Sequence, residues 1–245
     1  MKKERLDKLL IDKGLAQSRE RAKALVLAGV VLINGQRAQK SAAMVDPGAN
    51  IELKQPDLPY VSRGGVKLAG ALKAFDICVK DLTAADIGAS TGGFTDCLLQ
   101  HGASKVYAID VGYGQLSLKL RNDTRVCLFE RTNIRFIDLD LFDPKPDLIA
   151  IDVSFISLRL VLPVALQMLK PDGKIIALIK PQFEVGKKEV EKGGVIRTVQ
   201  KQHAVVLSIG LFAREMGLRD VAVMESPILG VKGNREFLIY LQSSD

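Results

Sequence analysis

The first 53 residues combine two helical patterns with short strand patterns. Apolar residues at helical spacing predict a first helix that begins near Leu6 and ends at Gly14. Ser18 is a typical N-cap residue, and it precedes a second helical pattern that Gly29 ends. Strand patterns at residues 30–33 and 51–53 enclose two turn signals, Asn34-Gly35 and Asp46-Pro47-Gly48. This alternation predicts a small α+β domain over residues 1–53, joined by a proline-containing linker over residues 54–60 to the rest of the chain.

From residue 61 onward the pattern changes to strands that alternate with helices. The predicted strands are Thr83–Gly88, Lys105–Asp110, Arg125–Phe129, Leu148–Val153, Lys174–Ile179, Asp220–Met224 and Glu236–Leu241. The predicted helices are Lys67–Phe75, Gly93–His101, Gln115–Asn122, Leu158–Leu169 and Thr198–Met216. Alternation of this kind predicts an α/β domain over residues 61–245, with a Rossmann-like, doubly wound and mostly parallel sheet of seven strands.

Composition narrows the class of protein. Hydrophobic residues make up 47% of the 245 residues and charged residues 26%, which is typical of a globular chain and argues against wholesale disorder. The three cysteines are far apart and the chain has only two histidines, so neither a disulfide framework nor a cysteine- or histidine-based metal site is expected. The longest apolar stretch is interrupted by Asp152 and Arg159, and the first ten residues are charged throughout. We therefore expect a cytoplasmic protein without a membrane partner.

The net charge of +7 permits a polyanionic partner such as a nucleic acid. Residues 1–60 hold 11 Lys and Arg against 7 Asp and Glu, so a quarter of the chain carries more than half of this excess. Within that quarter, the predicted second helix presents Arg19, Arg21 and Lys23, and Arg37 and Lys40 follow the hairpin. Basic side chains there would pair with phosphates without reading a base sequence. A solvated basic helix without a ligand is the alternative interpretation of the same charges.

A glycine-rich turn carries the strongest local signal. Residues 85–94 read Ala-Asp-Ile-Gly-Ala-Ser-Thr-Gly-Gly-Phe, at the junction between a predicted strand and a helix. Asp110 ends the next strand, where an acidic side chain can hold both hydroxyls of a ribose. The spacing does not fit the dinucleotide fingerprint or a P-loop, so the pattern indicates a nucleoside-containing cofactor. Gly88 would allow the tight turn, and Gly92 and Gly93 would let the ligand approach the backbone.

The same turn also fits a nucleophile elbow, Gly-x-Ser-x-Gly, and Ser90, Asp152 and His203 follow one another in the order of a hydrolase triad. His203, however, lies inside a helical pattern rather than in a loop after the last strand. A serine hydrolase is therefore the weaker alternative.

Four charged residues from separate segments share one kind of position. Asp152 and Lys180 follow predicted strands, Glu236 opens the last strand, and Lys67 precedes the sheet. The carboxyl ends of parallel strands meet at one edge, and an antiparallel last strand would begin at that edge. The pattern favours one cluster of Lys67, Asp152, Lys180 and Glu236, although each alone could be an ordinary surface charge.

Five blocks of sequence together resemble the TlyA family, whose members join an S4 RNA-binding domain to an FtsJ/RrmJ-like 2′-O-methyltransferase domain. The blocks are Tyr60–Lys67 (YVSRGGVK), Gly88–Thr95 (GASTGGFT), Asp110–Gln115 (DVGYGQ), Asp152–Ser157 (DVSFIS) and Lys180–Gly186 (KPQFEVG). The N-terminal region is similar to S4 domains through Arg5–Leu10, Ser18-Arg19 and Gly29–Gly35. Some members of the family are labelled haemolysins, and this sequence offers no membrane-inserting segment to support that label.

The resemblance implies a class I methyltransferase fold, S-adenosyl-L-methionine as cofactor and a cytidine 2′-hydroxyl of ribosomal RNA as acceptor. It also implies a catalytic tetrad that matches Lys67, Asp152, Lys180 and Glu236, with Lys180 as either a base or an electrostatic guide. The expected cofactor contacts are Asp86, Gly88, Ser90, Gly92, Gly93, Phe94, Asp110, Thr132, Asn133 and Asp152. The expected RNA contacts are Arg5, Ser18, Arg19, Arg21, Lys23, Arg37, Lys40 and Arg63, in ribosomal subunits or their RNA. The charged loop from Gly186 to Gly194 is a candidate lid, and an RNA-binding protein without catalysis is the remaining alternative.

Overall fold

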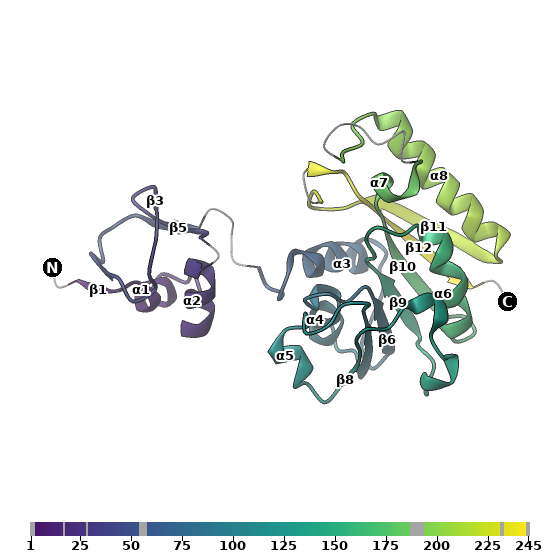
Figure 1. The fold of residues 1–245 in the computed structure, drawn as a ribbon, viewed down its shortest axis with the longest axis horizontal. Helices are drawn as coiled ribbons and strands as arrows, with labels where there is room; N and C mark the ends of the chain where they lie inside the picture. Colours follow the sequence, from purple (N-terminus) through teal and green to yellow (C-terminus); the bar gives the residue numbers. More distant parts are fainter. Residues whose placement is uncertain are drawn as a thin grey trace. The chain divides into compact units, whose positions relative to one another are not determined.

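The computed structural model describes residues 3–16, 18–27, 29–53, 58–186, 194–230 and 233–243. The chain divides into two compact units, Met1–Leu58 and Pro59–Asp245, each with its own hydrophobic core. Figure 1 shows the elements of both units along the chain. Residues 54–57 of the predicted linker lie outside the described residues.

The N-terminal unit packs two helices against short antiparallel strands. Its elements are β1 (Glu4–Arg5), α1 (Leu6–Asp12), α2 (Arg19–Leu27), β2 (Val31–Ile33), β3 (Gln36–Arg37), β4 (Met44–Val45) and β5 (Ile51–Leu53). The strand order β3-β2-β5 forms one sheet, and β1 pairs separately with β4. The pair β1–β4 was not predicted, because strands of two residues show no periodicity that a sequence could reveal.

The sequence pattern located the core of this unit. Leu6, Leu9 and Leu10 of α1 are buried, as are Ala22, Leu25 and Val26 of α2. The Ser18 hydroxyl oxygen accepts a hydrogen bond from the Arg21 N–H at 3.1 Å, which confirms Ser18 as the N-cap of α2. Gly29 has φ +72°, the left-handed conformation that ends a helix at low cost when the residue is glycine.

The second unit is an α/β domain. Its elements before the middle of the domain are α3 (Arg63–Ala74), β6 (Thr83–Ile87), α4 (Gly93–Gln100), β7 (Lys105–Ile109), α5 (Leu118–Arg121), β8 (Val126–Phe129) and the 3₁₀ turns η1 (Ile134–Phe136) and η2 (Leu139–Leu141). They are followed by β9 (Leu148–Ile151), the 3₁₀ turn η3 (Leu158–Leu160), α6 (Leu162–Met168), β10 (Lys174–Ile179), α7 (Pro181–Glu184), α8 (Val199–Glu215), β11 (Leu218–Glu225) and β12 (Phe237–Ser243).

These strands form one sheet of seven in the order β11-β12-β10-β9-β6-β7-β8, which confirms the predicted fold class. Strand β12 runs antiparallel to both neighbours, and the strands from β10 to β8 are parallel. The chain moves outward from β6 to β7 and β8, then returns to place β9 on the other side of β6. A crevice forms at such a switch point, outside the carboxyl ends of the central strands.

Two apolar layers enclose the sheet. Side chains of α6 and α8 pack on one face, and side chains of α3 and α4 pack on the other; Figure 1 shows the helices on either side of the sheet. Every residue of β6 and β9 is buried, because helices cover both faces there. Strand β9 therefore reads as a continuous apolar run, whereas β6 also buries the polar residues Thr83 and Asp86.

Helix boundaries differ most from the prediction at three places. Helix α3 begins at Arg63, four residues before the predicted start at Lys67. The predicted helix at 115–122 is confined to α5, because Ser117 is extended and the helix begins after it. The predicted helix at 158–169 is divided into η3 and α6. Pro163 stands in the first turn of α6, where a residue without an N–H loses no helical hydrogen bond.

Candidate active site

The turn after β6 brings the ends of two strands into contact. Gly88 has φ +90°, and a Cβ atom on it would lie 2.5 Å from the backbone oxygen of Asp152. The Asp152 N–H donates to the Ile87 carbonyl at 2.9 Å, so β6 and β9 remain paired up to this point. Any side chain at residue 88 would both strain the backbone and separate the two strand ends.

The next two glycines make room for neighbouring segments of the protein. A Cβ atom on Gly92, which has φ +97°, would overlap the side chains of Leu116 and Leu120. A Cβ atom on Gly93 would overlap the Ser62 hydroxyl and the backbone of Gly65. Both glycines thus allow close packing, of α4 against α5 and against the start of α3, and Gly93 also lines a cavity of the site. A cofactor contact by either glycine stays a prediction.

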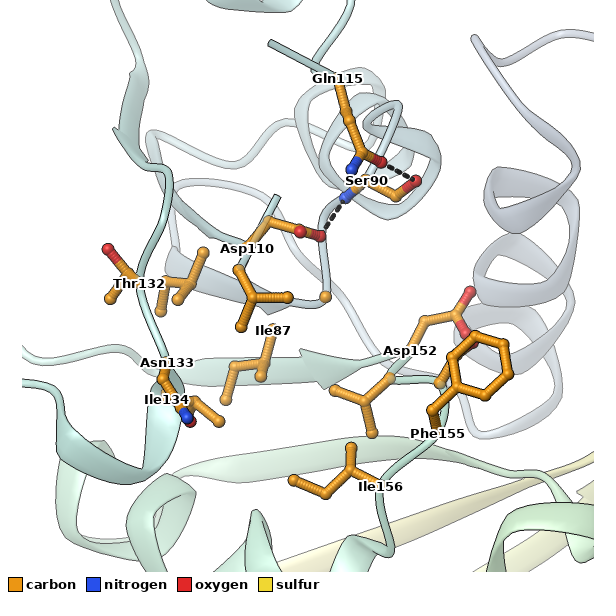
Figure 2. Close-up of a pocket in the computed structure, with 15 residues that line it drawn as sticks. Ile87, Ser90, Asp110, Gln115, Thr132, Asn133, Ile134, Asp152, Phe155 and Ile156 are labelled. Atoms are coloured by element: carbon orange, nitrogen blue, oxygen red, sulfur yellow. Dashed lines mark hydrogen bonds between the residues drawn. The ribbon is translucent and has the colours of Figure 1, made fainter. Parts of the chain in front are cut away.

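A cavity of about 370 Å³ opens beside this turn, as Figure 2 shows. At its polar end, Asp110 accepts hydrogen bonds from the N–H groups of Ser90 (2.8 Å) and Gly112 (2.6 Å). The Ser90 hydroxyl donates to Gln115 Oε1 at 3.3 Å. The remaining walls of the cavity include Ile87, Val111, Thr132, Asn133, Ile134 and Ile156. Apolar walls with a carboxylate at one end suit a ligand that has a flat ring at one end and hydroxyl groups at the other.

Asp86 lies behind the turn and does not line this cavity. Its side chain has no exposed surface, and its Oδ2 accepts hydrogen bonds from the Thr95 N–H (2.8 Å) and hydroxyl (2.6 Å). Burial raises the pKa of Asp86 to about 7, and the nearby carboxylates of Asp152 and Asp110 act in the same direction. The geometry gives Asp86 the role of fastening α4 to β6, and a direct cofactor contact by this residue stays a prediction.

A second cavity of about 170 Å³ adjoins the first and contains Lys180. Gly88, Ser90, Asp152 and Ser154 line both cavities, so the two cavities are direct neighbours. The Lys180 Nζ lies 2.7 Å from Asp152 Oδ1 and donates to the Ser154 hydroxyl at 2.8 Å. Phe94 also lines this second cavity, in agreement with its expected position at the site.

The other pair of the predicted cluster lies beside the first. Lys67 Nζ contacts Glu236 Oε2 at 2.6 Å, and both side chains are buried. Strands β10 and β12 are paired up to Ile179 and Phe237, so Lys180 and Glu236 are the next residues on neighbouring strands. The structure thus brings Lys67, Asp152, Lys180 and Glu236 together as two lysine–carboxylate pairs at one edge of the sheet.

Several residues of the site were not singled out from the sequence. Ser154 holds Lys180, Gln115 holds Ser90, and Phe155 lines the first cavity with a ring that is 90% exposed. Phe155 has φ +64°, an uncommon conformation for an aromatic residue, and its ring packs against Phe183 with centroids 5.0 Å apart. Figure 2 shows this ring beside the Asp152 carboxylate. All three residues lie within conspicuous sequence blocks, which was the only signal available.

The alternative of a serine hydrolase is wrong. The Ser90 hydroxyl donates to Gln115, and Asp152 is paired with Lys180. His203 lies on α8 with its ring centroid 6.4 Å from that of Phe237. The three residues therefore do not form the hydrogen-bonded series that a triad requires.

Some of the predicted RNA contacts are exposed, and others have a partner within the protein or are half-buried. Arg19, Lys23, Arg37 and Lys40 are exposed, and the Arg37 guanidinium lies directly over Gly29. Arg5 forms two hydrogen bonds with the buried Asp7, and this pairing lowers the pKa of Asp7. Ser18 caps α2, Arg21 is half-buried, and the exposed Arg63 of the second unit donates to the Leu229 carbonyl. Residues 187–193 of the candidate lid lie outside the described residues.

Both units match known families. The FtsJ-like methyltransferase family matches residues 60–243, and the S4 domain family matches residues 4–51. The 16S/23S rRNA (cytidine-2′-O)-methyltransferase TlyA of Mycobacterium tuberculosis is 45% identical over 98% of this chain and 90% of its own length. The chain belongs to the TlyA family.

Two further relatives also match this TlyA-family chain over nearly its whole length. The Bacillus subtilis protein YqxC, whose name includes the words rRNA methyltransferase, is 49% identical over 98% of this chain and 86% of its own length. A solved structure from Streptococcus thermophilus that carries the label hemolysin is 44% identical, covers 100% of this chain and 90% of its own, and has a TM-score of 0.78. In the described part of the chain, no helix is long and apolar enough to cross a membrane, and no group of His, Cys, Asp and Glu could hold a metal ion.

The contact at Gly88 predicts a large cost for a side chain there. We expect Gly88→Ala to lower the free energy of unfolding by about 2–4 kcal/mol, because left-handed strain and overpacking against Asp152 add together. Gly217→Ala is the matched control, since Gly217 has φ +81° and open space around it. Strain alone should cost about 1 kcal/mol there. Urea unfolding of both variants tests this, and equal losses would contradict the proposed contact.

The raised pKa of Asp86 predicts a pH-dependent stability. Between the ordinary carboxyl pKa and about 7, the folded chain holds a proton that the unfolded chain has released. The stabilising contribution of the neutral group is therefore present at low pH and is lost as pH rises towards 7, by up to about 1.4 kcal/mol per pH unit. In urea titrations from pH 5 to pH 8, we expect the free energy of unfolding of the wild type to fall relative to that of Asp86→Asn. Parallel curves would show that Asp86 is already ionised.

Proposed function

We propose that the chain transfers a methyl group from S-adenosyl-L-methionine to the 2′-hydroxyl of a cytidine in ribosomal RNA, and that the S4 unit docks the RNA. The observation that carries this proposal is the position of the Lys180–Asp152 pair directly beside a nucleoside-sized cavity, with Asp152 in the lining of both neighbouring cavities. The family and the names of its relatives support the reaction class.

The first cavity fits the nucleoside part of this cofactor. Asp110 presents a carboxylate that can accept hydrogen bonds from ribose hydroxyls, and Thr132 and Asn133 would border the adenine. The apolar walls Ile87, Ile134 and Ile156 would enclose the ring. When bound, the cofactor supplies an electrophilic methyl group on a sulfonium ion. Asp152 lines both cavities and would place a negative charge near that cation.

The second cavity fits the acceptor hydroxyl. Lys180 is held by Asp152 and Ser154, so its Nζ has a fixed direction and can orient an oxygen atom. Because Lys180 is ion-paired with Asp152, we favour the role of an electrostatic guide over that of a free amine base. The oxygen would bond to the methyl carbon as the carbon–sulfur bond breaks, and the hydroxyl proton would be released to water. The Lys67–Glu236 pair would keep Lys67 from competing for Asp152. Alignment of the oxygen with the methyl group contributes much of the remaining rate.

The exposed ring of Phe155 gives the acceptor base a partner. It lies at the cavity wall, packs against Phe183 and is otherwise exposed to solvent. An unpaired nucleobase stacks on such a ring, and methylation of a ribose inside a folded RNA requires the target nucleotide to leave its neighbours. The chain thus has an oriented cation for the hydroxyl and an aromatic surface for the base.

Two lysine–aspartate pairs at opposite ends of the same strands allow a matched test. Lys180 and Asp152 follow β10 and β9, whereas Lys170 and Asp147 precede them, and each pair spans 2.7 Å. We expect Lys180→Met to reduce methyl transfer to ribosomal subunits by about 10²–10⁴-fold, and Lys170→Met to leave it within about twofold. The assay counts labelled methyl groups that make RNA resistant to alkaline cleavage at one ribose.

Equal effects of Lys170→Met and Lys180→Met would remove the catalytic role of Lys180. Cofactor binding by the wild type without any transfer to either subunit would instead support an RNA-binding protein that lacks catalysis. Transfer to a base rather than to a ribose would leave the methylated RNA sensitive to alkali, and would contradict the proposed acceptor.

Docking by the S4 unit predicts a salt-dependent contribution from its exposed basic residues. We expect Arg19→Gln and Lys23→Gln each to weaken binding to ribosomal subunits and to lower the slope of log Kd against log salt by about 1. The control is Lys73→Gln, because Lys73 is an exposed lysine on α3 of the other unit. Binding measured between about 50 and about 300 mM salt decides the question. An unchanged slope in both S4 variants would place the phosphate contacts elsewhere.

A further inference from the structure

Two loops beside the cofactor cavity expose large apolar side chains that the core does not use. Tyr113, in the loop after β7, is 67% exposed, and Phe136, in the 3₁₀ turn after β8, is 78% exposed. Val111, next to Asp110, is 70% exposed and lines the cavity. A single exposed apolar residue is ordinary, but a group of them on neighbouring loops marks an interaction surface.

Each of the two exposed rings carries an arginine. The Arg131 guanidinium carbon lies 4.1 Å from the centroid of the Tyr113 ring, and that of Arg135 lies 5.1 Å from the centroid of Phe136. Among the described residues, neither arginine has a carboxylate partner within 4.0 Å, whereas neighbouring Arg121 is paired with Glu130 at 2.6 Å. The Arg135 Nε donates to Asn133 Oδ1 at 3.4 Å, and the terminal N–H groups of both arginines can bind an anionic ligand. We call the surface formed by Tyr113, Arg131, Arg135 and Phe136 the arginine–aromatic rim.

The rim is fixed to the walls of the cofactor cavity. The Arg131 N–H donates to the Gly112 carbonyl at 2.9 Å, which joins the two loops, and the Thr132 N–H donates to the Asp110 carbonyl at 2.9 Å. Glu130 accepts hydrogen bonds from the Gly114 N–H (2.7 Å) and from Arg121, and these contacts lower the pKa of Glu130. The loop that carries Tyr113 is thus fixed to the end of β8 by hydrogen bonds on both sides of Tyr113.

The backbone at Arg131 supports a role beyond packing. Arg131 has φ +52°, a conformation that costs free energy in any residue other than glycine. In this conformation the Arg131 guanidinium lies over the exposed Tyr113 ring. Residues kept in such conformations are concentrated at ligand-binding sites, and here the strained residue adjoins Thr132 and Asn133 of the cavity wall.

We propose that the arginine–aromatic rim is a second RNA-docking surface, which binds unpaired nucleotides next to the methylated one. The inference rests on the proposed function. Exposed rings stack on nucleobases, and arginines bind phosphates, and the two together are the combination that single-stranded RNA requires. An acidic protein segment would use the arginines but would gain little from two flat exposed rings, so RNA fits the surface better. The rim would hold the strand while the S4 unit supplies separate phosphate contacts.

The test compares the RNA and cofactor constants of the full-length chain. We expect Tyr113→Leu/Phe136→Leu, which keeps apolar bulk but removes both rings, to raise the KM for ribosomal subunits by about tenfold or more. The KM for S-adenosyl-L-methionine and kcat at saturating RNA should stay within about twofold. The single variant Tyr113→Phe keeps a ring at residue 113 and leaves Phe136 unchanged. It should show little of the rise in KM that the double variant shows. Arg131→Gln should lower the slope of log Kd against log salt by about 1.

One matched control lies at the opposite end of β8 from the rim, and the other lies on α8. Arg125 precedes β8 and is paired with Asp123, so Arg125→Gln removes an arginine that is not free. Leu211 of α8 is 57% exposed, and Leu211→Ala removes apolar surface away from the rim. Both controls should leave the KM for subunits unchanged.

Three results would overturn the assignment. The first is an unchanged RNA KM in the double variant, and the second is a rise in the cofactor KM alone, which would make the rim part of the cofactor site. The third is loss of binding to intact subunits with unchanged binding to deproteinised ribosomal RNA, which would identify a ribosomal protein as the partner. If the wild type transfers no methyl group, the proposed function fails, and Kd values for subunits then decide on the rim by the same comparisons. No binding of the wild type to RNA would overturn the rim as well.

Discussion

The close approach of β6 and β9 at Gly88 is the constraint on which the rest of the site depends. Residue 88 has no side chain, so the Asp152 carbonyl can lie against it, and the two strands stay paired to their ends. This contact places Asp152 at the floor of both cavities. It also leaves the turn that follows β6 free to curve around the cofactor cavity. A wider turn would separate the carboxylate from Lys180 and open the site to water.

Desolvation explains why the four charged residues are arranged as two pairs. A buried ammonium or carboxylate group is costly without a partner, and a pair with good geometry recovers much of that cost. Lys67 and Glu236 are almost completely buried and are paired with each other, whereas Asp152 keeps part of its surface open. The buried pair suits a structural and electrostatic support. The open pair faces the space in which a substrate would lie.

Loop contacts convert this edge of the sheet into a rigid surface. Glu184 of α7 accepts hydrogen bonds from the Ser157 hydroxyl (2.6 Å) and the Leu158 N–H (2.8 Å), which fastens the loop after β9 to the loop after β10. Glu130 fastens the loop after β7 to the end of β8 in the same way. Each anchor is a carboxylate that satisfies backbone N–H groups in an irregular segment. Aromatic rings on these loops, Phe155 and Tyr113, are exposed because the loops do not need them for support.

The sequence by itself determined the fold class and the location of most of the site. Strand and helix periodicities gave the order of elements, since a strand covered on both faces is a continuous apolar run. Polar residues directly after such runs, Asp110, Asp152 and Lys180, were predicted as site residues because parallel strands end at one edge. The resemblance to a family supplied the cofactor and the acceptor, which no periodicity encodes.

Only the tertiary structure decided which partners these residues have. The sequence could not show that Lys180 pairs with Asp152 and Lys67 with Glu236, because pairing depends on distances between segments as far as 169 residues apart. Nor could it show that Gly92 and Gly93 accommodate neighbouring helices, or that Asp86 is sealed behind the turn with a raised pKa. Burial, close contact and desolvation arise from the packing of distant segments, whereas a local pattern records only the conformation and polarity of its own residues.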